Sequence, residues 1–332
     1  MTGWAAGTFP WLDDEGDRPA PTVRVIVDND FAGDPDDLFQ VVHHLLSPGV
    51  DLRGIVASHL APGDGFDPGP DTATHAADKL RELFGVAGFD GESLIWLGSE
   101  DGLVDASTPQ PCEAVDRIVA EAMRDDERPL YYCAGGGLTD IVSAWLVEPR
   151  IAERLTVIWI GGPEHSFAPA APEGVGVSEY NLKIDVTAAR VLFNDSDLPL
   201  WQVPRDAYRQ CLVSNVELRR RVAPKGELGR YLADSITGLS RLLAQHGFGH
   251  AETYCMGDQP LVLLSALQSR FEPDPSSSSY VVVPAPRLDE KGEYEDAPGG
   301  RDIRVWTSLD LRLMFEDFFL KLDEHAAWHP GA

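Results

Sequence analysis

The chain has 332 residues, of which 43% are apolar and 24% are charged, and its formal net charge is −27. This charge opposes binding to nucleic acid or to an anionic membrane, because both carry negative phosphate groups. The sequence has no stretch that approaches the ~20 apolar residues of a membrane-spanning helix. We therefore expect a small-molecule partner that is uncharged or cationic, and neither nucleic acid nor membrane.

The chain is expected to fold as one domain over residues 22–325, although its length alone suggests about two domains. Residues 1–21 have neither the basic start nor the apolar run of a signal peptide, so we expect an N-terminal arm and a cytoplasmic protein. Residues 326–332 are expected to form a C-terminal tail. The four cysteines are widely spaced and are predicted to be core thiols: Cys112, Cys133, Cys211 and Cys255.

Apolar runs alternate with amphipathic segments along most of the chain. The runs predict strands, and they lie at residues 23–27, 52–58, 93–98, 129–136, 154–162 and 198–203. The segments between them, such as 73–85 and 113–123, have helical spacing. This alternation predicts an α/β fold with a mainly parallel central sheet flanked by helices. Residues 214–268 then predict a helical C-terminal cap, and 280–285 a short strand between surface loops.

Five aspartates follow the first predicted strand in the stretch "DNDFAGDPDD", residues 28–37, and a helix is predicted directly after it. Such a loop lies at the carboxyl ends of the strands, where open α/β sheets bind ligands. Carboxylates this close repel one another unless a cation compensates them. Helix capping is the alternative for Asp34, Asp36 and Asp37. Capping leaves Asp28 and Asp30 unexplained, so the pattern favours a cation site.

Together with four later motifs, this stretch resembles the inosine/uridine-type nucleoside hydrolases over almost the whole chain. The later motifs are "SLIWLGSEDGL", "GGGLTDIVSAWLVEPRIAERLTVIWIGG", "SEYNLKIDVTAARVLF" and "MGDQPLVLLSAL". The resemblance implies a Rossmann-like open sheet and a calcium-dependent N-ribohydrolase that releases ribose and free base from a nucleoside. It also implies a homodimer or homotetramer and a role in purine or pyrimidine salvage.

The resemblance also implies the residues that hold the metal ion. Asp30 would bind Ca²⁺ and act as general base on a calcium-bound water, while Asp37 and Asp258 would complete the carboxylate set. The backbone carbonyl of Gly135 would be a further ligand. This donor set agrees with the chemistry of Ca²⁺, which takes about six to eight oxygen ligands.

Further residues are implied to bind the sugar or support the loop. Asp36 and Asn181 would hold the ribose 2′- and 3′-hydroxyls, and Glu179 the 5′-hydroxyl side. Asp28 would brace the loop from behind the metal ligands. Anionic oxygens beneath the sugar would stabilise the oxocarbenium-like state of N-glycoside cleavage.

The chain departs from the family pattern at the sugar contacts. Its first loop is two residues longer, so the register of Asp30 rests on aligning the terminal Asp-Asp pair. An asparagine after the second strand is absent, and His59 or Asp64 would substitute for it. Glu173 stands where a second asparagine is usual. These changes predict altered sugar binding.

A histidine that many members carry before the last metal aspartate is replaced by Gly257. Such a histidine can protonate the leaving base, so leaving-group activation is unassigned in this chain. His246 and His250 lie nearby in sequence, but a histidine in a helical stretch is more often a surface or core residue.

Other interpretations of the same residues remain open at this stage. Glu179 and Asn181, two apart on an extended segment, could form an ordinary polar edge, and Asp258 could cap a helix. "GGGLTD" lacks the spacing of a dinucleotide-binding loop. Asp28 could be the nucleophile of a haloacid-dehalogenase-type phosphatase, although a phosphate-binding residue and a later acid pair are missing. A non-catalytic, calcium-dependent sugar-binding module is the remaining alternative.

Overall fold

The computed structural model describes residues 3–12, 20–169, 171, 179–245, 247, 251–269, 277–295, 297 and 299–328. Within these residues the central sheet contains eight strands: β2 (Val23–Asn29), β3 (Val50–Ala57), β5 (Ile95–Leu97), β6 (Leu130–Ala134), β7 (Leu155–Ile160), β8 (Leu200–Val203), β11 (Ser279–Pro284) and β14 (Asp302–Ser308). Their order is β11-β14-β8-β7-β6-β2-β3-β5. Only β11, which pairs with β14 at one edge, is antiparallel to its neighbour. The predicted α/β fold with a mainly parallel sheet is confirmed.

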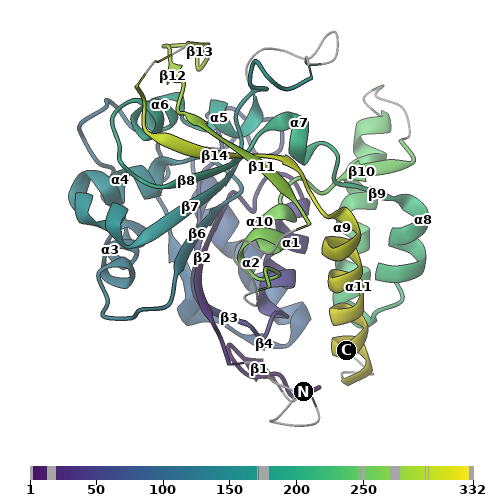
Figure 1. Ribbon diagram of the computed structural model, residues 1–332. Coiled ribbons are helices and arrows are strands. Elements are labelled where there is room, and N and C mark those ends of the chain that lie inside the picture. The colour runs from purple at the N-terminus through teal and green to yellow at the C-terminus, as the bar shows by residue number, and fades with distance from the viewer. Residues whose placement is uncertain are drawn as a thin grey trace.

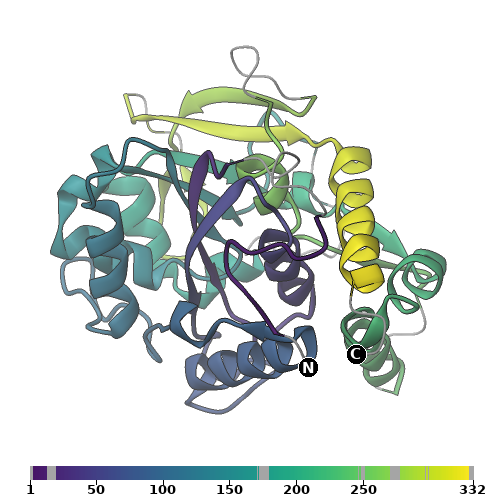
Figure 2. The same cartoon turned by 90° about the horizontal axis from the view of Figure 1, so that it is seen from below.

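Helices cover both faces of this sheet (Figures 1 and 2). One face carries α1 (Asp36–Leu45), α2 (Thr72–Ala87), α9 (Gly226–Gln245), α10 (Pro260–Ser265) and α11 (Leu311–Trp328). The other carries α3 (Glu113–Ala122), α4 (Thr139–Val147) and α6 (Val186–Asn194). Successive side chains of β2 point to opposite faces of the sheet and so join both hydrophobic clusters. Val25 and Val27 belong to the first cluster, and Ile26 belongs to the second.

Shorter elements complete the described chain. Two-residue strands β1 (Trp4–Ala5) and β4 (Phe89–Asp90) pair, as do β12 (Arg287–Leu288) with β13 (Tyr294–Glu295) and β9 (Leu212–Ser214) with β10 (Thr253–Cys255). Short helices are α5 (Tyr180–Ile184), α7 (Arg205–Tyr208) and α8 (Asn215–Glu217). Single turns of other helix types span Glu92–Leu94, Pro149–Glu153 and Leu218–Val222. They lie mostly at the ends of the larger elements.

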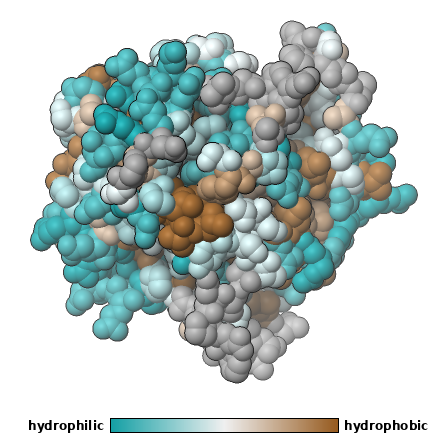
Figure 3. Space-filling model, turned by 45° about the horizontal axis from the view of Figure 1, so that its top comes forward, coloured by the Kyte–Doolittle hydropathy of each residue, from teal (hydrophilic) through white to brown (hydrophobic). Residues whose placement is uncertain are grey.

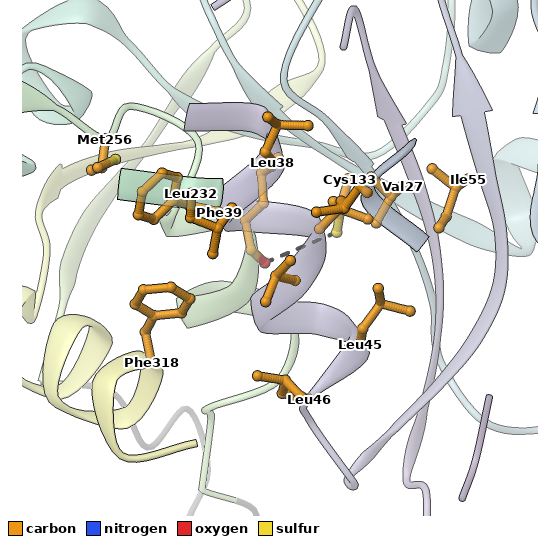
Figure 4. Close-up of a cluster of buried hydrophobic side chains, with 14 of the residues drawn as sticks. Val27, Leu38, Phe39, Leu45, Leu46, Ile55, Cys133, Leu232, Met256 and Phe318 are labelled. Carbon is orange, nitrogen blue, oxygen red and sulfur yellow. Dashed lines mark hydrogen bonds between the residues drawn. The ribbon is translucent and has the colours of Figure 1, made fainter. Parts of the chain in front are cut away.

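The core around α1 explains why the aspartate loop is held so firmly. All ten residues of α1 are buried, and its apolar side chains pack against β2, α9 and α11 (Figure 4). Leu38 and Phe39 lie beside Leu232 and Phe318 in this cluster. A helix buried on every side is fixed by its neighbours rather than by its own propensity.

The helical segment predicted over residues 214–268 is present as α8, α9 and α10. After it β11 and β14 return to the main sheet, so the strand predicted at 280–285 belongs to that sheet and not to a surface loop, and α11 follows. Helix α11 ends at Trp328, three residues beyond the predicted domain boundary at 325. At the other end, Trp4 is buried and its indole donates to the carbonyl of Ala87 at 2.9 Å.

The surface of the molecule carries both hydrophilic and apolar side chains. On the face shown in Figure 3 hydrophilic side chains dominate, and apolar ones gather in small patches. Among the described residues, every helix is too short or too polar to cross a lipid bilayer.

Candidate active site

A small cavity lies where the carboxyl ends of β2, β6 and β7 meet helices α1, α5 and α10. Its volume is about 150 Å³, and its lining includes the carboxylates of Asp30, Asp34, Asp36, Asp37, Glu179 and Asp258. The neutral lining residues include Gly135, Tyr180, Asn181, Tyr208 and Cys255. The parallel strands all point their carboxyl ends at this place, so acids far apart in sequence converge there.

Two consecutive glycines let the chain pass directly against the carboxylates. A Cβ on Gly135 would fall 2.2 Å from Oδ2 of Asp258, and one on Gly136 would fall 2.8 Å from Oδ1 of Asp30. Any side chain at these positions would displace the acids. The "GGG" after β6 therefore provides close backbone approach to the carboxylates.

The aspartates of the first loop stand at the start of α1. Asp36 and Asp37 occupy its first turn, where the helix dipole favours negative charge. The N-cap residue is Pro35, which makes no side-chain capping hydrogen bond. The carboxylate of Asp34 accepts a hydrogen bond from the backbone N–H of Asp36, the first residue of α1, so the alternative that an aspartate binds the start of the helix is supported in part.

Asp258 reaches the same place from the start of α10 and is held by two contacts. Its Oδ2 accepts a hydrogen bond from Nδ2 of Asn29 at 2.6 Å, and its backbone N–H donates to Oδ2 of Asp36 at 3.1 Å. The N-cap of α10 is Gln259, so Asp258 is not a helix cap. Burial raises the pKa of Asp258 from its ordinary value to about 7.

The carboxylates have no positive partner among the described residues that line the cavity. Burial, followed by the charge of Asp258, raises the pKa of Asp30 and Asp37 well above the ordinary range. Burial and the charge of the neighbouring Asp34 likewise raise the pKa of Asp36 well above the ordinary range. Oδ2 of Asp30 and Oδ2 of Asp37 are buried without a hydrogen-bond partner. Uncompensated oxygens of this kind fit a site for a cation.

Glu179 and Asn181 flank the cavity on the far side, but the backbone there is helical. Glu179 is the N-cap of α5, and its carboxylate accepts from the N–H groups of Asn181 and Leu182. It also accepts from the N–H of Gly162 at 2.9 Å and the hydroxyl of Tyr208 at 2.8 Å. The expectation of an extended segment with a shared face is therefore wrong, and the capping role explains the spacing instead.

Asn181 is oriented by two backbone carbonyls. Its Nδ2 donates to the oxygen of Gly135 at 2.5 Å and to that of Ile160 at 2.8 Å. These contacts leave Oδ1 available as an acceptor. They also place the carbonyl of Gly135 beside the carboxylates, where the sequence predicted it.

Two predicted residues, Asp28 and His59, are not among the residues that line the cavity. Asp28 is fully buried beneath it, and its Oδ2 accepts from the hydroxyl of Tyr132 at 2.5 Å. His59 is also buried, and its ring nitrogens contact the carbonyl of Leu60 and the hydroxyl of Thr139. Its position gives no support to a role in sugar binding. Glu173 lies outside the described residues, as do His246 and His250.

Sequence reasoning missed the tyrosines around the cavity. Tyr180 and Tyr208 line it, and Tyr254 donates its hydroxyl to Oδ1 of Asp34. Cys255 also lines the cavity, whereas it was predicted to be a core thiol. Two of these residues had a signal in the sequence, since Tyr180 lies inside the Glu-x-Asn motif and Cys255 lies three residues before Asp258.

A larger cavity of about 660 Å³ lies elsewhere, between the loop after β7 and the β12–β13 hairpin. Its lining includes the stacked rings of His165 and Phe167 and the ring of Tyr294. Its charged groups include Glu164, which is already paired with Arg205 at 2.5 Å. The carboxylate cavity is the better candidate for chemistry, because its charges are unpaired and its residues converge from several elements.

Comparison with known proteins agrees with this geometry. Residues 25–295 match the family described as inosine-uridine preferring nucleoside hydrolase. The chain belongs to this family. The matched range contains every residue predicted for the site, from Asp28 to Asp258.

Individual relatives are more distant. An inosine-uridine preferring nucleoside hydrolase of Crithidia fasciculata is 35% identical over 216 residues, which are 64% of this chain and 58% of that protein. One of Leishmania major is 37% identical over 91 residues, which are 27% of this chain and 26% of that protein. The chain thus spans less than two thirds of the length of these relatives.

Solved structures share the fold at low sequence identity. A purine-preferring ribonucleoside hydrolase from Gardnerella vaginalis has a TM-score of 0.69 at 18% identity, covering 91% of this chain and 99% of that one. The plant nucleoside hydrolase PpNRh1 has a TM-score of 0.66 at 17% identity, with the same coverage.

Proposed function

We propose that this protein hydrolyses the N-glycosidic bond of a ribonucleoside or related N-riboside, giving ribose and free base. The observation that carries the proposal is the convergence of Asp30, Asp37 and Asp258 on one cavity, with buried oxygens of the first two lacking any partner. Family membership supports the same reaction.

We propose Ca²⁺ as the cofactor. The donors are hard oxygens: the carboxylates of Asp30, Asp37 and Asp258 and the carbonyl of Gly135. Among the described residues, no three acidic, histidine or cysteine side chains are arranged closely enough to hold a metal ion. The proposal of Ca²⁺ therefore depends on the buried carboxylate oxygens that have no hydrogen-bond partner. When bound, Ca²⁺ supplies a Lewis acid that makes water more acidic and helps to orient the sugar.

Within this proposal, the residues of the cavity have separate tasks. Asp30 accepts the proton of the attacking water, because its Oδ2 has no other partner. Asp36 and the free Oδ1 of Asn181 accept hydrogen bonds from ribose hydroxyls. The remaining negative charge stabilises the oxocarbenium character that develops at C1′.

Glu179 has a different task from the one expected. Its two carboxylate oxygens already accept four hydrogen bonds, from Gly162, Asn181, Leu182 and Tyr208. We infer that it positions α5 and Tyr208, and that the Tyr208 oxygen faces the sugar in its place. This agrees with the altered sugar contacts that the sequence predicts.

The test is a product screen. Purine and pyrimidine ribosides are incubated with the protein in calcium and in chelator, and free ribose is measured. We expect ribose release that depends on Ca²⁺. Absence of ribose from every riboside, combined with tight calcium-dependent binding of ribose, would favour the sugar-binding module instead.

The phosphatase alternative has no structural support. Asp28 is fully buried, bonded to Tyr132 and absent from the cavity lining, so it cannot reach a phosphate as a nucleophile.

We further propose one domain over residues 22–325, a homodimer or homotetramer, a cytoplasmic location and a role in nucleoside salvage. The continuous central sheet supports the single domain, and the family membership supports the role in salvage. Size-exclusion chromatography with light scattering would determine the oligomeric state.

A further inference from the structure

The cavity holds more negative charge than one Ca²⁺ balances. Six carboxylates line it, from Asp30, Asp34, Asp36, Asp37, Glu179 and Asp258, and no lysine, arginine or histidine is among the described lining residues. One divalent ion leaves most of this charge uncompensated. A second positive charge in the cavity would lower the repulsion among these groups.

Asp34 is the acid that neither the metal set nor the proposed sugar contacts employ. It lies in the longer first loop, and burial raises the pKa of its carboxyl. Its carboxylate accepts hydrogen bonds from the hydroxyl of Tyr254 and from the backbone N–H of Asp36. This acid therefore has no task in the proposed hydrolysis itself.

The hydroxyl and thiol groups around the cavity, among the described residues, are already engaged as donors to other groups of the protein. The hydroxyl of Tyr180 donates to Asp64 at 2.9 Å, that of Tyr208 to Glu179 at 2.8 Å, and that of Tyr254 to Asp34. The thiol of Cys255 donates to the carbonyl of Tyr208 at 3.4 Å. Burial raises the pKa of all three tyrosine hydroxyls, so they hold their protons firmly.

A neutral nucleobase needs a proton donor because it leaves the sugar as an anion unless it is protonated. A base whose ring already carries a positive charge shared by the glycosidic nitrogen leaves as a neutral molecule. An excess of carboxylates and a shortage of proton donors therefore favour the same kind of substrate.

Resting on the proposed hydrolase function, we propose that the preferred substrates are N-ribosides with a cationic aglycone, such as pyridinium ribosides or N7-alkylated purine ribosides. In the reaction the C1′–N bond breaks, and its electron pair passes to the nitrogen, which becomes neutral. The oxygen of water forms the new bond to C1′. Its proton passes to Asp30 and then to solvent.

Three ribosides test the proposal in calcium: nicotinamide riboside, 7-methylguanosine assayed where its ring is cationic, and neutral uridine. We expect kcat/KM for at least one cationic riboside to exceed that for uridine by about 100-fold or more, which is the usual contribution of an acid that only the neutral base needs. The two cationic ribosides distinguish a pyridinium site from a purine site. Equal or faster cleavage of uridine would overturn the proposal.

A variant pair tests the role of charge. Asp34→Asn keeps the shape and the acceptor for Tyr254 but removes a negative charge, so the cationic-to-neutral ratio of kcat/KM should fall by about tenfold. Asp78→Asn removes a charge from the surface of α2, where that side chain is 65% exposed, and should leave the ratio unchanged. A ratio unaltered by Asp34→Asn would contradict the assignment of this residue.

Binding separates this proposal from the proposed function. Calorimetry compares 1-methylnicotinamide with nicotinamide, which differ mainly in charge, and we expect the cation to bind about tenfold more tightly. If no riboside releases ribose, the hydrolase proposal fails while this measurement still reports the cation preference. If ribose is released but the neutral ligand binds equally well, the cation preference fails alone.

Discussion

Buried charged residues lie at both ends of strand β2, but in the described part of the chain only those at the amino end are paired with an opposite charge. At the amino end, Arg24 is 2% exposed and its Nη1 lies 2.8 Å from Oε1 of Glu121. Its guanidinium also donates to the carbonyls of Glu121, Asp126 and Arg128. At the carboxyl end, Asp30 and its neighbours have no cation among the described residues.

The difference distinguishes buried charges that stabilise the fold from buried charges that can bind a ligand. The Arg24 cluster is internally neutralised, so it needs nothing from outside the chain. The carboxylate cluster is not neutralised, and the raised pKa of Asp30 and Asp37 reflects that cost. A protein keeps such a cluster where a ligand supplies the missing charge.

The largest expected effect comes from Asp30→Asn at the carboxyl end. The amide keeps an oxygen and nearly the same shape but cannot accept the proton, so kcat should fall by about 10²–10⁴-fold or more. Calcium content and binding of a ribose analogue should change much less. Near wild-type turnover would move the base to Asp34, because Asp28 does not line the cavity.

Asp37→Ala provides the contrast for that experiment. It removes a proposed calcium ligand outright, so calcium content and ligand binding should be lost together. Elemental analysis of protein prepared without chelator checks this, with about one Ca²⁺ per chain expected for the parent. Stoichiometric zinc with no calcium in the parent would contradict the cofactor proposal.

At the amino end, Glu121→Ala should destabilise the fold without altering the chemistry. It leaves Arg24 buried with its nearest remaining carboxylate oxygen, on Asp126, 3.8 Å away, and the loss should be about 3 kcal/mol in urea unfolding. Calcium affinity and kcat of the folded fraction should stay unchanged. The control is Asp78→Ala in an exposed pair, which should change stability little.

Calcium should stabilise the protein, and most strongly at alkaline pH. Burial raises the pKa of Asp28 to about 8 and of Asp258 to about 7, against about 3.9 for an unfolded aspartate. Between the unfolded pKa of about 3.9 and the folded pKa values of about 7 and 8, the folded state therefore binds more protons than the unfolded state. Without metal, stability should fall as pH rises from 5 to 8.

Thermal unfolding in chelator and in calcium checks this pH dependence. Calcium at 100 times its Kd should add about 2.7 kcal/mol, and it should flatten the dependence. A Tm in chelator that rises from pH 5 to 8 would show that these carboxylates are ionised without cost.

The smallest effect should come from Asn29→Ala, which removes the hydrogen bond to Oδ2 of Asp258. Asp258 would lose its orientation but remain present, so calcium affinity should weaken by about tenfold. Asn215→Ala is the control, because that side chain donates its hydrogen bond to the carbonyl of Ala251 at the surface. Equal affinity in both variants would show that Asn29 does not position the ligand.

The sequence predicted the strands that form the centre of the sheet because each contains a short apolar run, which in β2, β3 and β7 is rich in β-branched residues. It did not place β14, whose residues Asp302–Ser308 mix charged and apolar side chains. Nor did it place β11 in the main sheet, because strand order depends on contacts between distant segments. Local pattern carries no information on those contacts.

The acids of the site were predictable for a related reason. Aspartates clustered at a strand end are costly, and that cost is visible in sequence. The tyrosine partners of these acids could not be predicted from the sequence, because a tyrosine in a loop or short helix has many ordinary roles. Tyr254 meets Asp34 across 220 positions of the chain, and only the fold brings them together.

Helix α1, buried on every side, has a consequence for motion. Asp36 and Asp37 sit in its first turn, so these acids move only if the core itself opens. Amide protons within α1 should therefore exchange with solvent only through global unfolding, and a bound ligand should slow this exchange only by as much as it stabilises the whole fold. Any closure around a substrate must come from the surrounding loops, moving against acids that stay still.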